Sequence, residues 1–236
     1  MPKKTKFKHN AINQGDGLEL LRYLPDNSVK LVFFDPQYEK VKQVLKRNYP
    51  LAFQPDEQIN QFCREIARAL KPSGFCLLWV NKTVLSTARV LSSPVKDCGF
   101  IGLVQAKYSG YGFLVEKSSG VCFFIAKQPA NHKLFKNRGF GNVWAEDQLI
   151  VNKRNHPHQK PKGLIKALIE ATTEKGNLIV DPCAGSFIVL EVCQETKREF
   201  LGCDLTYQAT REFMSKGQKA RQGLSQVCLD CWEFIA

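Results

Sequence analysis

The chain has 236 residues, of which 44% are hydrophobic and 24% are charged, a composition that excludes a largely disordered protein and predicts one globular domain. Lys and Arg number 34 against 22 Asp and Glu, so the net charge is +12, which favours a polyanionic partner such as nucleic acid. No apolar run approaches the roughly 20 residues that a membrane-spanning helix needs, and the scattered cysteines favour a reducing cytoplasm.

The N-terminal part begins with a basic segment, residues 1–10, that we predict to be a mobile tail. Asp16 then precedes apolar residues at helical spacing and is followed three residues later by Glu19, a pattern typical of a helix N-terminus. The apolar run 29–34 predicts a buried strand that ends abruptly at Asp35. Alone, such an Asp-Pro strand end is an ordinary turn signal.

Helical and extended patterns alternate through the middle of the chain. A single apolar stripe predicts a helix over about residues 55–70, and the apolar run 75–80 predicts a buried strand. A short helix near residues 83–91 and strands over 100–106 and 121–126 follow. This alternation predicts a largely parallel sheet with helices on both faces.

The segments after residue 106 differ, because basic, aromatic and glycine residues mix there without a period. This composition is typical of loops that contact phosphates and stack on bases, and it also fits surface loops with incidental aromatics. The side chains selected as nucleic-acid contacts are Lys107, Tyr108, Tyr111, Lys133, Lys136, Arg138 and Arg154.

The C-terminal part predicts a strand, a turn of small residues, a helix and a second strand. The first strand covers 177–180, the turn begins at Asp181, and the second strand over 199–203 ends at Asp204. This is the layout of a nucleoside-binding crevice, in which turn amides approach the ligand and the distal carboxylate takes the ribose hydroxyls. Because only Gly185 fills a glycine position, a plain βαβ unit remains the alternative.

Residues 156–161, His-Pro-His-Gln-Lys-Pro, precede an amphipathic helix in this C-terminal part. The two histidines have no further ligand cluster nearby, and the Cys228 and Cys231 pair has no second pair. No metal site is predicted from either group.

Together these blocks resemble the amino-group DNA methyltransferases that use S-adenosylmethionine, in the circularly permuted order of their β class. The resemblance covers most of the chain and rests on five blocks in family order: Gly15-Asp16, Asp35-Pro36-Gln37-Tyr38, residues 156–161, residues 181–186 and Asp204. It implies a Rossmann-like α/β fold over residues 1–236, with the catalytic half first, the cofactor half last, and a small target-recognition insertion over about 107–154.

The resemblance implies roles for the tetrapeptide at residues 35–38. Asp35 and the carbonyl of Pro36 would accept both hydrogens of a target amine, which turns the nitrogen lone pair towards the methyl donor. Tyr38 would stack on a base that has been flipped out of the duplex. No general base is needed before transfer.

The resemblance also implies a binding site for S-adenosylmethionine. Asp16 would bond the adenine amine, Asp204 the ribose hydroxyls, and the chain at Leu205 would cover the adenine face. The residues implied to face the methionine part are Asp181, Cys183, Ala184, Gly185 and Ser186, helped by His158 and Lys160.

Three positions depart from the family pattern. Gln37 stands where a second proline is usual, so the turn is less rigid. Phe187 replaces the glycine that ends the family's cofactor turn, where its ring would obstruct the backbone approach unless it rotates away. His158 stands where threonine is usual.

We therefore expect a bacterial or phage enzyme that methylates N6 of adenine in double-stranded DNA, because tetrapeptides that begin with Asp resemble the adenine enzymes. The alternatives are a cytosine N4 DNA methyltransferase, an RNA methyltransferase, and a non-catalytic DNA-binding module of methyltransferase descent. The short insertion favours a homodimer, a hypothesis that rests on size alone.

Overall fold

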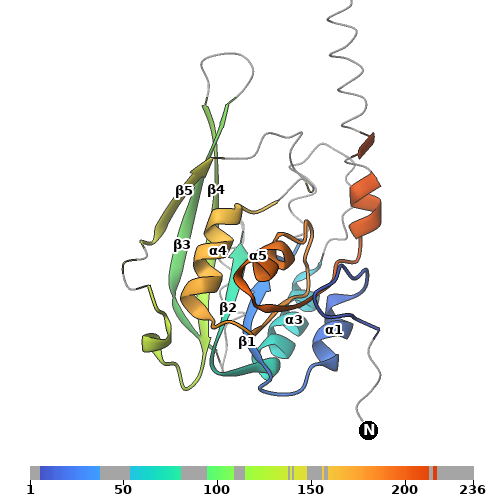
Figure 1. Cartoon of the computed structure of the whole chain (residues 1–236), viewed down its shortest axis with the longest axis vertical. Coiled ribbons are helices and arrows are strands. Elements are labelled where there is room, and N and C mark those ends of the chain that lie inside the picture. The colour runs from blue at the N-terminus through green and yellow to red at the C-terminus, as the bar shows by residue number, and fades with distance from the viewer. Residues whose placement is uncertain are drawn as a thin grey trace, which may run out of the picture.

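A computed structural model describes residues 6–37, 54–80, 95–108, 115–137, 139, 141–147, 156, 159–212 and 215–216, without the side chains of 80, 95–108, 115–120, 132 and 147. Its seven strands form one sheet in the order β5-β3-β4-β2-β1-β6-β7 (Figure 1). The strands are β1 (Val29–Phe34), β2 (Leu70–Val80), β3 (Val95–Tyr108), β4 (Val115–Lys127), β5 (Val143–Asp147), β6 (Leu178–Asp181) and β7 (Glu199–Gly202). The helices are α1 (Gly17–Tyr23), α3 (Asp56–Ala69), α4 (Lys162–Thr172), α5 (Ile188–Thr196) and the short 3-10 helix η2 (His132–Leu134).

Strand direction follows the length of the connections. β1 pairs in parallel with β2 and with β6, and β6 pairs in parallel with β7. β4 is antiparallel to both of its neighbours, β2 and β3. The predicted parallel pairing therefore holds for the sheet except at β4. Too few residues separate β3 from β4 for a helical crossover, so these two strands form an antiparallel hairpin.

The two faces of the sheet carry two separate hydrophobic clusters, and the alternation along β1 shows the division. Leu31 and Phe33 belong to the cluster that includes α4 and α5, whereas Val32 and Phe34 belong to the cluster that includes α1 and α3. Figure 1 shows α4 and α5 on one side of the sheet and α1 and α3 on the other. β1 is therefore a central strand buried on both faces, as its unbroken apolar run predicts.

The first described residues are part of this core. Phe7 is buried, and the Asn10 amide donates to the carbonyl of Phe200 at 2.8 Å. Residues 6–10 thus pack on the domain, in contrast to the predicted mobile tail, because Phe7 supplies an apolar anchor among the lysines. Residues 1–5 and the predicted helix over 83–91 lie outside the described residues.

The region predicted as an insertion contains strands of the main sheet. β4 joins β2, and β5 pairs in parallel with β3 at the sheet edge. The far ends of β3 and β4 extend the hairpin beyond β2 (Figure 1). Within the described residues, the part that stands apart from the sheet is therefore this hairpin end, and not all of 107–154.

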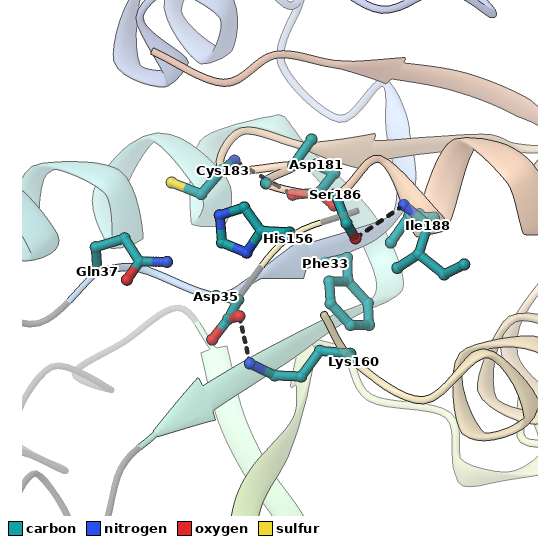
Figure 2. A pocket seen from close by; sticks show the side chains of 12 residues that line it. Phe33, Asp35, Gln37, His156, Lys160, Asp181, Cys183, Ser186 and Ile188 are labelled. Atoms are coloured by element: carbon teal, nitrogen blue, oxygen red, sulfur yellow. Dashed lines mark hydrogen bonds and ion pairs between the residues drawn. The ribbon is translucent and has the colours of Figure 1, made fainter. Parts of the chain in front are cut away.

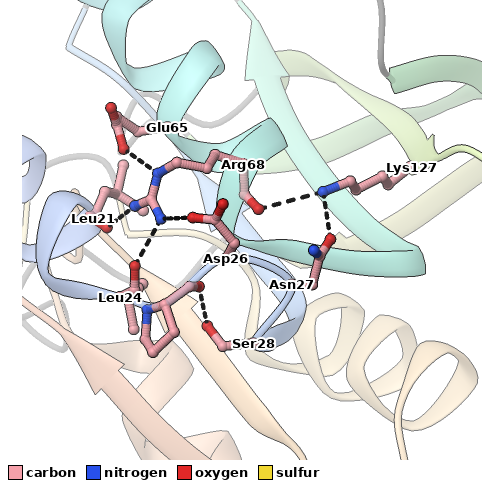
Figure 3. A network of polar contacts seen from close by, with 9 residues as sticks. Leu21, Leu24, Asp26, Asn27, Ser28, Glu65, Arg68 and Lys127 are labelled. Atoms are coloured by element: carbon pink, nitrogen blue, oxygen red, sulfur yellow. Dashed lines mark hydrogen bonds and ion pairs between the residues drawn. The ribbon is translucent and has the colours of Figure 1, made fainter.

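A half-buried arginine joins α3 to the turn that leads into β1 (Figure 3). The Arg68 guanidinium donates to the carbonyls of Leu21 and Leu24, each at 2.8 Å, and to the carboxylates of Asp26 at 2.6 Å and Glu65 at 2.8 Å. The Leu24 carbonyl follows the last turn of α1, where carbonyls lack partners within the helix, and the Leu21 carbonyl also accepts from the Leu24 amide. Arg68 thus ties the end of α1 to α3 just before β1.

No helix among the described residues is long and apolar enough to span a bilayer.

Candidate active site

The two predicted site strands end side by side. β1 and β6 pair in parallel, with Val32 opposite Val180. Asp35 follows the end of β1, and Asp181 is the last residue of β6. Because the carboxyl ends of parallel strands share one edge of a sheet, both carboxylates reach the same crevice.

A pocket lies at this edge and is lined from both halves of the chain (Figure 2). It brings together seven of the predicted site residues: Asp35, Lys160, Asp181, Cys183, Ala184, Gly185 and Ser186. Phe33, Gln37, His156, Ile188 and Val189 complete the lining. The target turn, which we define as residues 35–37, therefore faces the cofactor turn, residues 181–187, across one pocket.

Lys160 holds the carboxylate of the target turn. Its ammonium group donates to Oδ2 of Asp35 (Figure 2), and the two side chains are 20% and 22% exposed. The same ammonium lies 5.1 Å from the centre of the Trp79 ring on β2. Such shielding from solvent strengthens an ion pair relative to one on an open surface.

The position of Lys160 depends on how α4 begins. Pro161 provides no side-chain cap for this helix. Instead, the Glu146 carboxylate on β5 accepts from the amides of Gly163 and Leu164, each at 3.1 Å, and from the Trp144 indole at 2.9 Å. A carboxylate at a helix N-terminus is favourable for the helix dipole, so β5 anchors the segment that carries Lys160.

The cofactor turn is shaped mainly by backbone groups. The Ala184 amide donates to the Cys203 carbonyl at 3.0 Å, and the Cys203 amide donates to the Asp181 carbonyl at 3.1 Å. Gly185 has a φ of +48°, and a Cβ there would meet the His156 ring at 3.5 Å. Glycine is favoured at this point of the turn because it adopts the left-handed backbone without strain.

Phe187 occupies the other left-handed position of the turn, with φ 58° and ψ 25°. Its ring is 4% exposed and packs edge-on against Tyr207 and Phe200, with centroids 4.9 Å and 6.2 Å away. The ring has therefore rotated into the core, so it does not obstruct the approach of a cofactor to the backbone of the turn. The backbone keeps the left-handed conformation in which glycine is usual.

Asp204 closes the turn from β7. Its Oδ2 accepts from the Gly185 amide at 3.0 Å, and its Oδ1 accepts from the Thr206 amide at 2.8 Å. The Gly15 amide donates to the Asp204 carbonyl at 3.2 Å, which brings the neighbouring Asp16 to this end of the crevice. Asp16 caps α1 by accepting from the Leu18 amide at 2.8 Å.

Leu205, predicted to cover an adenine face, is 56% exposed beside Asp204. Asp16, Asp204 and Leu205 therefore lie outside the pocket lining. They are next to it, because the Asp204 carboxylate accepts from the amide of Gly185, which lines the pocket.

Burial controls the protonation of two groups in the cofactor turn. It raises the pKa of the Asp181 carboxyl well above its usual range, an effect that the Cys183 amide opposes by donating to Oδ1. Burial likewise raises the pKa of the Cys183 thiol well above its usual value. Cys183 is therefore a neutral thiol and not a nucleophile.

Sequence reasoning missed two residues of the site. His156 is buried with its ring against Gly185. Gln54 exchanges two bonds with Gln37: its Oε1 accepts from the Gln37 amide at 2.7 Å, and its own amide donates to the Gln37 carbonyl at 2.8 Å. The Gln54 side-chain amide also donates to Sγ of Cys183 at 3.4 Å. No motif in the sequence marks Gln54, which lies in no predicted block.

The structure separates the predicted nucleic-acid contacts. Lys107 and Tyr108 end β3 at its hairpin with β4. Lys136 donates to the Thr173 carbonyl at 2.9 Å and pairs with Glu174 at 2.5 Å, beside the C-terminal end of α4. Contact of Lys133 and Lys136 with nucleic acid stays a prediction. Tyr38, Tyr111, Arg138, Arg154 and His158 lie outside the described residues.

Among the described residues, no group of three or more His, Cys, Asp and Glu side chains is arranged to hold a metal ion. The polar groups that converge on the pocket are instead carboxylates, one ammonium and turn amides. This set of groups suits organic ligands: an amine that bonds to the carboxylate on one side of the pocket, and a ligand with polar groups on the other.

Comparison with known sequences gives consistent matches. A family model described as DNA methylase matches residues 125–215. The chain is 32% identical to the type II methyltransferase M.HhaII of Haemophilus parahaemolyticus over 212 residues, which cover 84% of this chain and 92% of that protein. It is 29% identical to the DNA adenine methyltransferase YhdJ of Escherichia coli K12, over 85% of this chain and 81% of that protein.

Comparison with solved structures identifies the fold as the Rossmann-like sheet of methyltransferases. The complex of M1.HpyAVI with SAM matches with a TM-score of 0.63 and 19% identity, over 89% of this chain and 98% of that one. The cytosine-N4-specific PvuII DNA methyltransferase matches with a TM-score of 0.63 and 18% identity, over 86% and 85%. The strand order along this chain, with Asp35 before Asp181, is consistent with the permuted arrangement.

Proposed function

Since the chain belongs to the family of S-adenosylmethionine-dependent DNA amino-methyltransferases, we propose that it methylates the exocyclic N6 of adenine in double-stranded DNA. The observation that carries the proposal is the pocket in which the target turn and the cofactor turn face each other. Asp35 supplies a carboxylate at one wall, and the buried Pro36 follows it in the chain. The opposite wall is the Gly185 turn.

The residues of the cofactor turn and its neighbours fit S-adenosylmethionine. Gly185 leaves the backbone accessible where a side chain would meet His156, and Asp204 presents a carboxylate beside the Gly185 amide. Asp204 and Asp16 would bind the ribose and the adenine amine, and residues 181–186 the methionine part, with His158 and Lys160 at its carboxylate. When bound, the cofactor supplies an electrophilic methyl group.

The target turn orients the amine. Asp35 and the Pro36 carbonyl accept one hydrogen each, so that the nitrogen lone pair is no longer held in conjugation with the ring and points across the pocket. As the N–CH3 bond forms, the S–CH3 bond of the sulfonium would break and the sulfur would leave as a neutral thioether. The nitrogen then loses one proton, which Asp35 is placed to receive. Tyr38 stacks on the flipped base, whose extrusion makes its amine accessible.

Lys160 has to yield its bond to Asp35 as the amine arrives. The Trp79 ring at 5.1 Å offers its ammonium a second favourable neighbour, because a cation over an indole face is stabilised by about 0.5–2 kcal/mol. The ion pair thereby holds the Asp35 carboxylate in place until the amine replaces the ammonium.

Adenine is preferred over cytosine on two grounds. The tetrapeptide begins with Asp, which resembles the adenine enzymes, and a relative at 29% identity is named a DNA adenine methyltransferase. Cytosine N4 is the second candidate, because a structure with the same fold is cytosine-N4-specific.

The test is transfer of a labelled methyl group from S-adenosylmethionine to duplex DNA, followed by mass spectrometry of the nucleosides. We expect N6-methyladenine. N4-methylcytosine would overturn the base assignment but keep the reaction class, and label on matched RNA alone would overturn DNA as the substrate. Cofactor binding without any transfer would favour the non-catalytic DNA-binding module, and an inactive Asp35→Ala protein is the control.

The DNA and subunit arrangements are also proposals. The side chains proposed to contact DNA are Lys107, Tyr108, Tyr111, Lys133, Lys136, Arg138 and Arg154. Replacing those that bind phosphates should lower the affinity for DNA uniformly across sequences. Modification mapping of genomic DNA from cells that express the protein would identify the recognised sequence. A monomer mass by light scattering at a fully active concentration would exclude the homodimer.

A further inference from the structure

The backbone amide of Gln37 is a hydrogen-bond donor that the usual family turn does not have. In the family pattern the third residue of the tetrapeptide is proline, which has no amide hydrogen. Here Gln37 stands at that position, and its partly buried amide donates to Oε1 of Gln54 at 2.7 Å. A buried amide left without a partner would cost about 1–3 kcal/mol, so the Gln54 side chain satisfies a need created by Gln37.

Gln54 makes three hydrogen bonds to described residues, and the bond to the Gln37 amide is one of them. Its backbone amide donates to the Gln37 carbonyl at 2.8 Å, which closes a two-bond pair between residues 37 and 54. Its side-chain amide donates to Sγ of Cys183 at 3.4 Å. One side chain thus joins the target turn to the cofactor turn.

Gln54 links two residues, Gln37 and Cys183, that stand next to groups assigned to the target amine and to the cofactor. Gln37 follows Pro36, whose carbonyl is one of the two groups assigned to the target amine, and Cys183 lies in the turn assigned to the methionine part of the cofactor. Both residues line the pocket. Gln54 itself does not line the pocket and touches neither reactant position, so any effect it has on catalysis acts through these two turns.

We propose that Gln54 is a positioning residue that replaces the rigidity of the missing proline and sets the distance between the target turn and the cofactor turn. This inference rests on the proposed function. A proline restricts the turn covalently, whereas Gln54 restricts it from outside by two bonds to Gln37. Removing the restraint lets the Pro36 carbonyl rotate, and misplacement of a reacting group by about 1 Å can lower a rate by ~100-fold.

The decisive experiment is a double-mutant cycle on methyl transfer to duplex DNA. We expect Gln54→Ala to lower kcat by about 10- to 100-fold, with a change of less than about threefold in the KM for S-adenosylmethionine. In the Gln37→Pro background the same Gln54→Ala change should lower kcat by no more than about threefold, because the amide that Gln54 serves is gone. Equal losses in both backgrounds, or no loss in either, would overturn the proposal.

Two controls separate positioning from folding. Gln61→Ala, on the neighbouring helix α3 and outside the pocket lining, should leave kcat unchanged. Gln54→Glu keeps an acceptor for the Gln37 amide but cannot donate to Cys183, so it should retain more activity than Gln54→Ala. If Gln54→Glu and Gln54→Ala lose activity equally, the bond to Gln37 is not the part that matters.

A second measurement is independent of activity. Hydrogen exchange at the Gln37 amide should be at least about tenfold faster in Gln54→Ala than in the wild-type protein, because the bond that protects it is lost. Unchanged exchange would overturn the link itself. A wild-type protein that exchanges as expected but transfers no methyl group would instead overturn the proposed function, and with it the catalytic role of Gln54.

Discussion

The two turns that face each other across the pocket are held in different ways. The cofactor turn is shaped by backbone bonds to the end of β7, among them those between Ala184 and Cys203. The target turn is held by side chains from elsewhere, namely Lys160 on Asp35 and Gln54 on Gln37. A turn built on backbone bonds tolerates side-chain changes such as Phe187, whereas a turn held by side chains can be loosened by a single substitution.

The largest test of this comparison is to remove the charge of the target turn. We expect Asp35→Asn to lower kcat at least about 1,000-fold, because its amide group presents only one acceptor and loses the attraction for the amine hydrogens. Affinity for S-adenosylmethionine should change by less than about threefold, since the cofactor turn does not depend on Asp35. Isothermal titration with the cofactor, beside methyl-transfer assays, measures both.

The matched control for that change is Glu65→Gln, which removes a carboxylate charge on α3 outside the pocket lining and should leave kcat and cofactor affinity unchanged. A comparable loss of cofactor affinity in Asp35→Asn and in a cofactor-turn variant such as Asp204→Ala would contradict the separation of the two turns.

The next largest effect concerns the ring of Phe187. Phe187→Ala and Phe187→Gly both remove a buried ring, which lowers the free energy of unfolding by about 3–5 kcal/mol. Glycine should be the less damaging of the two by about 1 kcal/mol, because it adopts the left-handed backbone at φ 58° without strain. Urea unfolding of the two proteins measures the difference.

This order is the reverse of what a helix interior would give, where alanine is the better residue. An alanine variant as stable as the glycine variant would show that the turn does not keep its left-handed backbone, and so that it is less rigid than its hydrogen bonds indicate.

A third test uses the protonation of Asp181. Burial raises the pKa of this carboxyl, so above the pKa of the unfolded chain the folded protein keeps a proton that the unfolded chain has lost. Its contribution to stability is therefore present at low pH and is lost as pH rises towards the folded pKa, by at most about 1.4 kcal/mol per pH unit. Asp181→Asn should flatten this dependence, because Oδ1 can still accept from the Cys183 amide.

Urea unfolding of both proteins at pH 5 and pH 8 gives the comparison, with the exposed Asp56→Asn on α3 as a control. We expect the Asp181→Asn protein to gain stability relative to the wild type as pH rises. A parallel pH dependence of the two would mean that Asp181 is ionised in the folded protein.

The smallest expected effect is at the anchor of Lys160. Glu146→Gln keeps one acceptor for the start of α4 but removes the charge that favours the helix dipole, so the free energy of unfolding should fall by about 0.5–1 kcal/mol. Glu170→Gln, exposed on the same helix, is the control. A loss in Glu170→Gln equal to that in Glu146→Gln, by thermal or urea unfolding, would show that β5 does not anchor the helix.

The sequence predicted the elements whose patterns are local. Helix α3 and strands β1 and β6 follow from apolar periodicity, and the meeting of Asp35 and Asp181 follows because both end parallel strands. The rotation of the Phe187 ring depends on Tyr207 and Phe200, and the residues that flank Phe187 carry no signal of it. The reversed direction of β4 goes with its short connection to β3, which the alternation of helical and extended patterns does not reveal.

The same distinction applies within the site. The residues of the two turns stand in recognisable blocks, whereas Gln54 contributes through contacts to residues 17 and 129 positions away. Lys136 shows the same dependence on packing, because no sequence pattern marks its bond to the Thr173 carbonyl at the end of α4. Composition identifies which residues are polar, and only packing decides what they bond.

The ion pair between Lys160 and Asp35 has a consequence for how DNA reaches the pocket. A bare carboxylate at the mouth would repel the phosphates on either side of the incoming nucleotide. The Asp35 carboxylate is balanced by the Lys160 ammonium, so the pair presents no net charge to an approaching strand until a base amine takes the place of the ammonium. Approach and selection of the base are thereby separated: phosphates meet a neutral entrance, and the full attraction of the carboxylate is kept for a nucleotide that brings two hydrogens to bond.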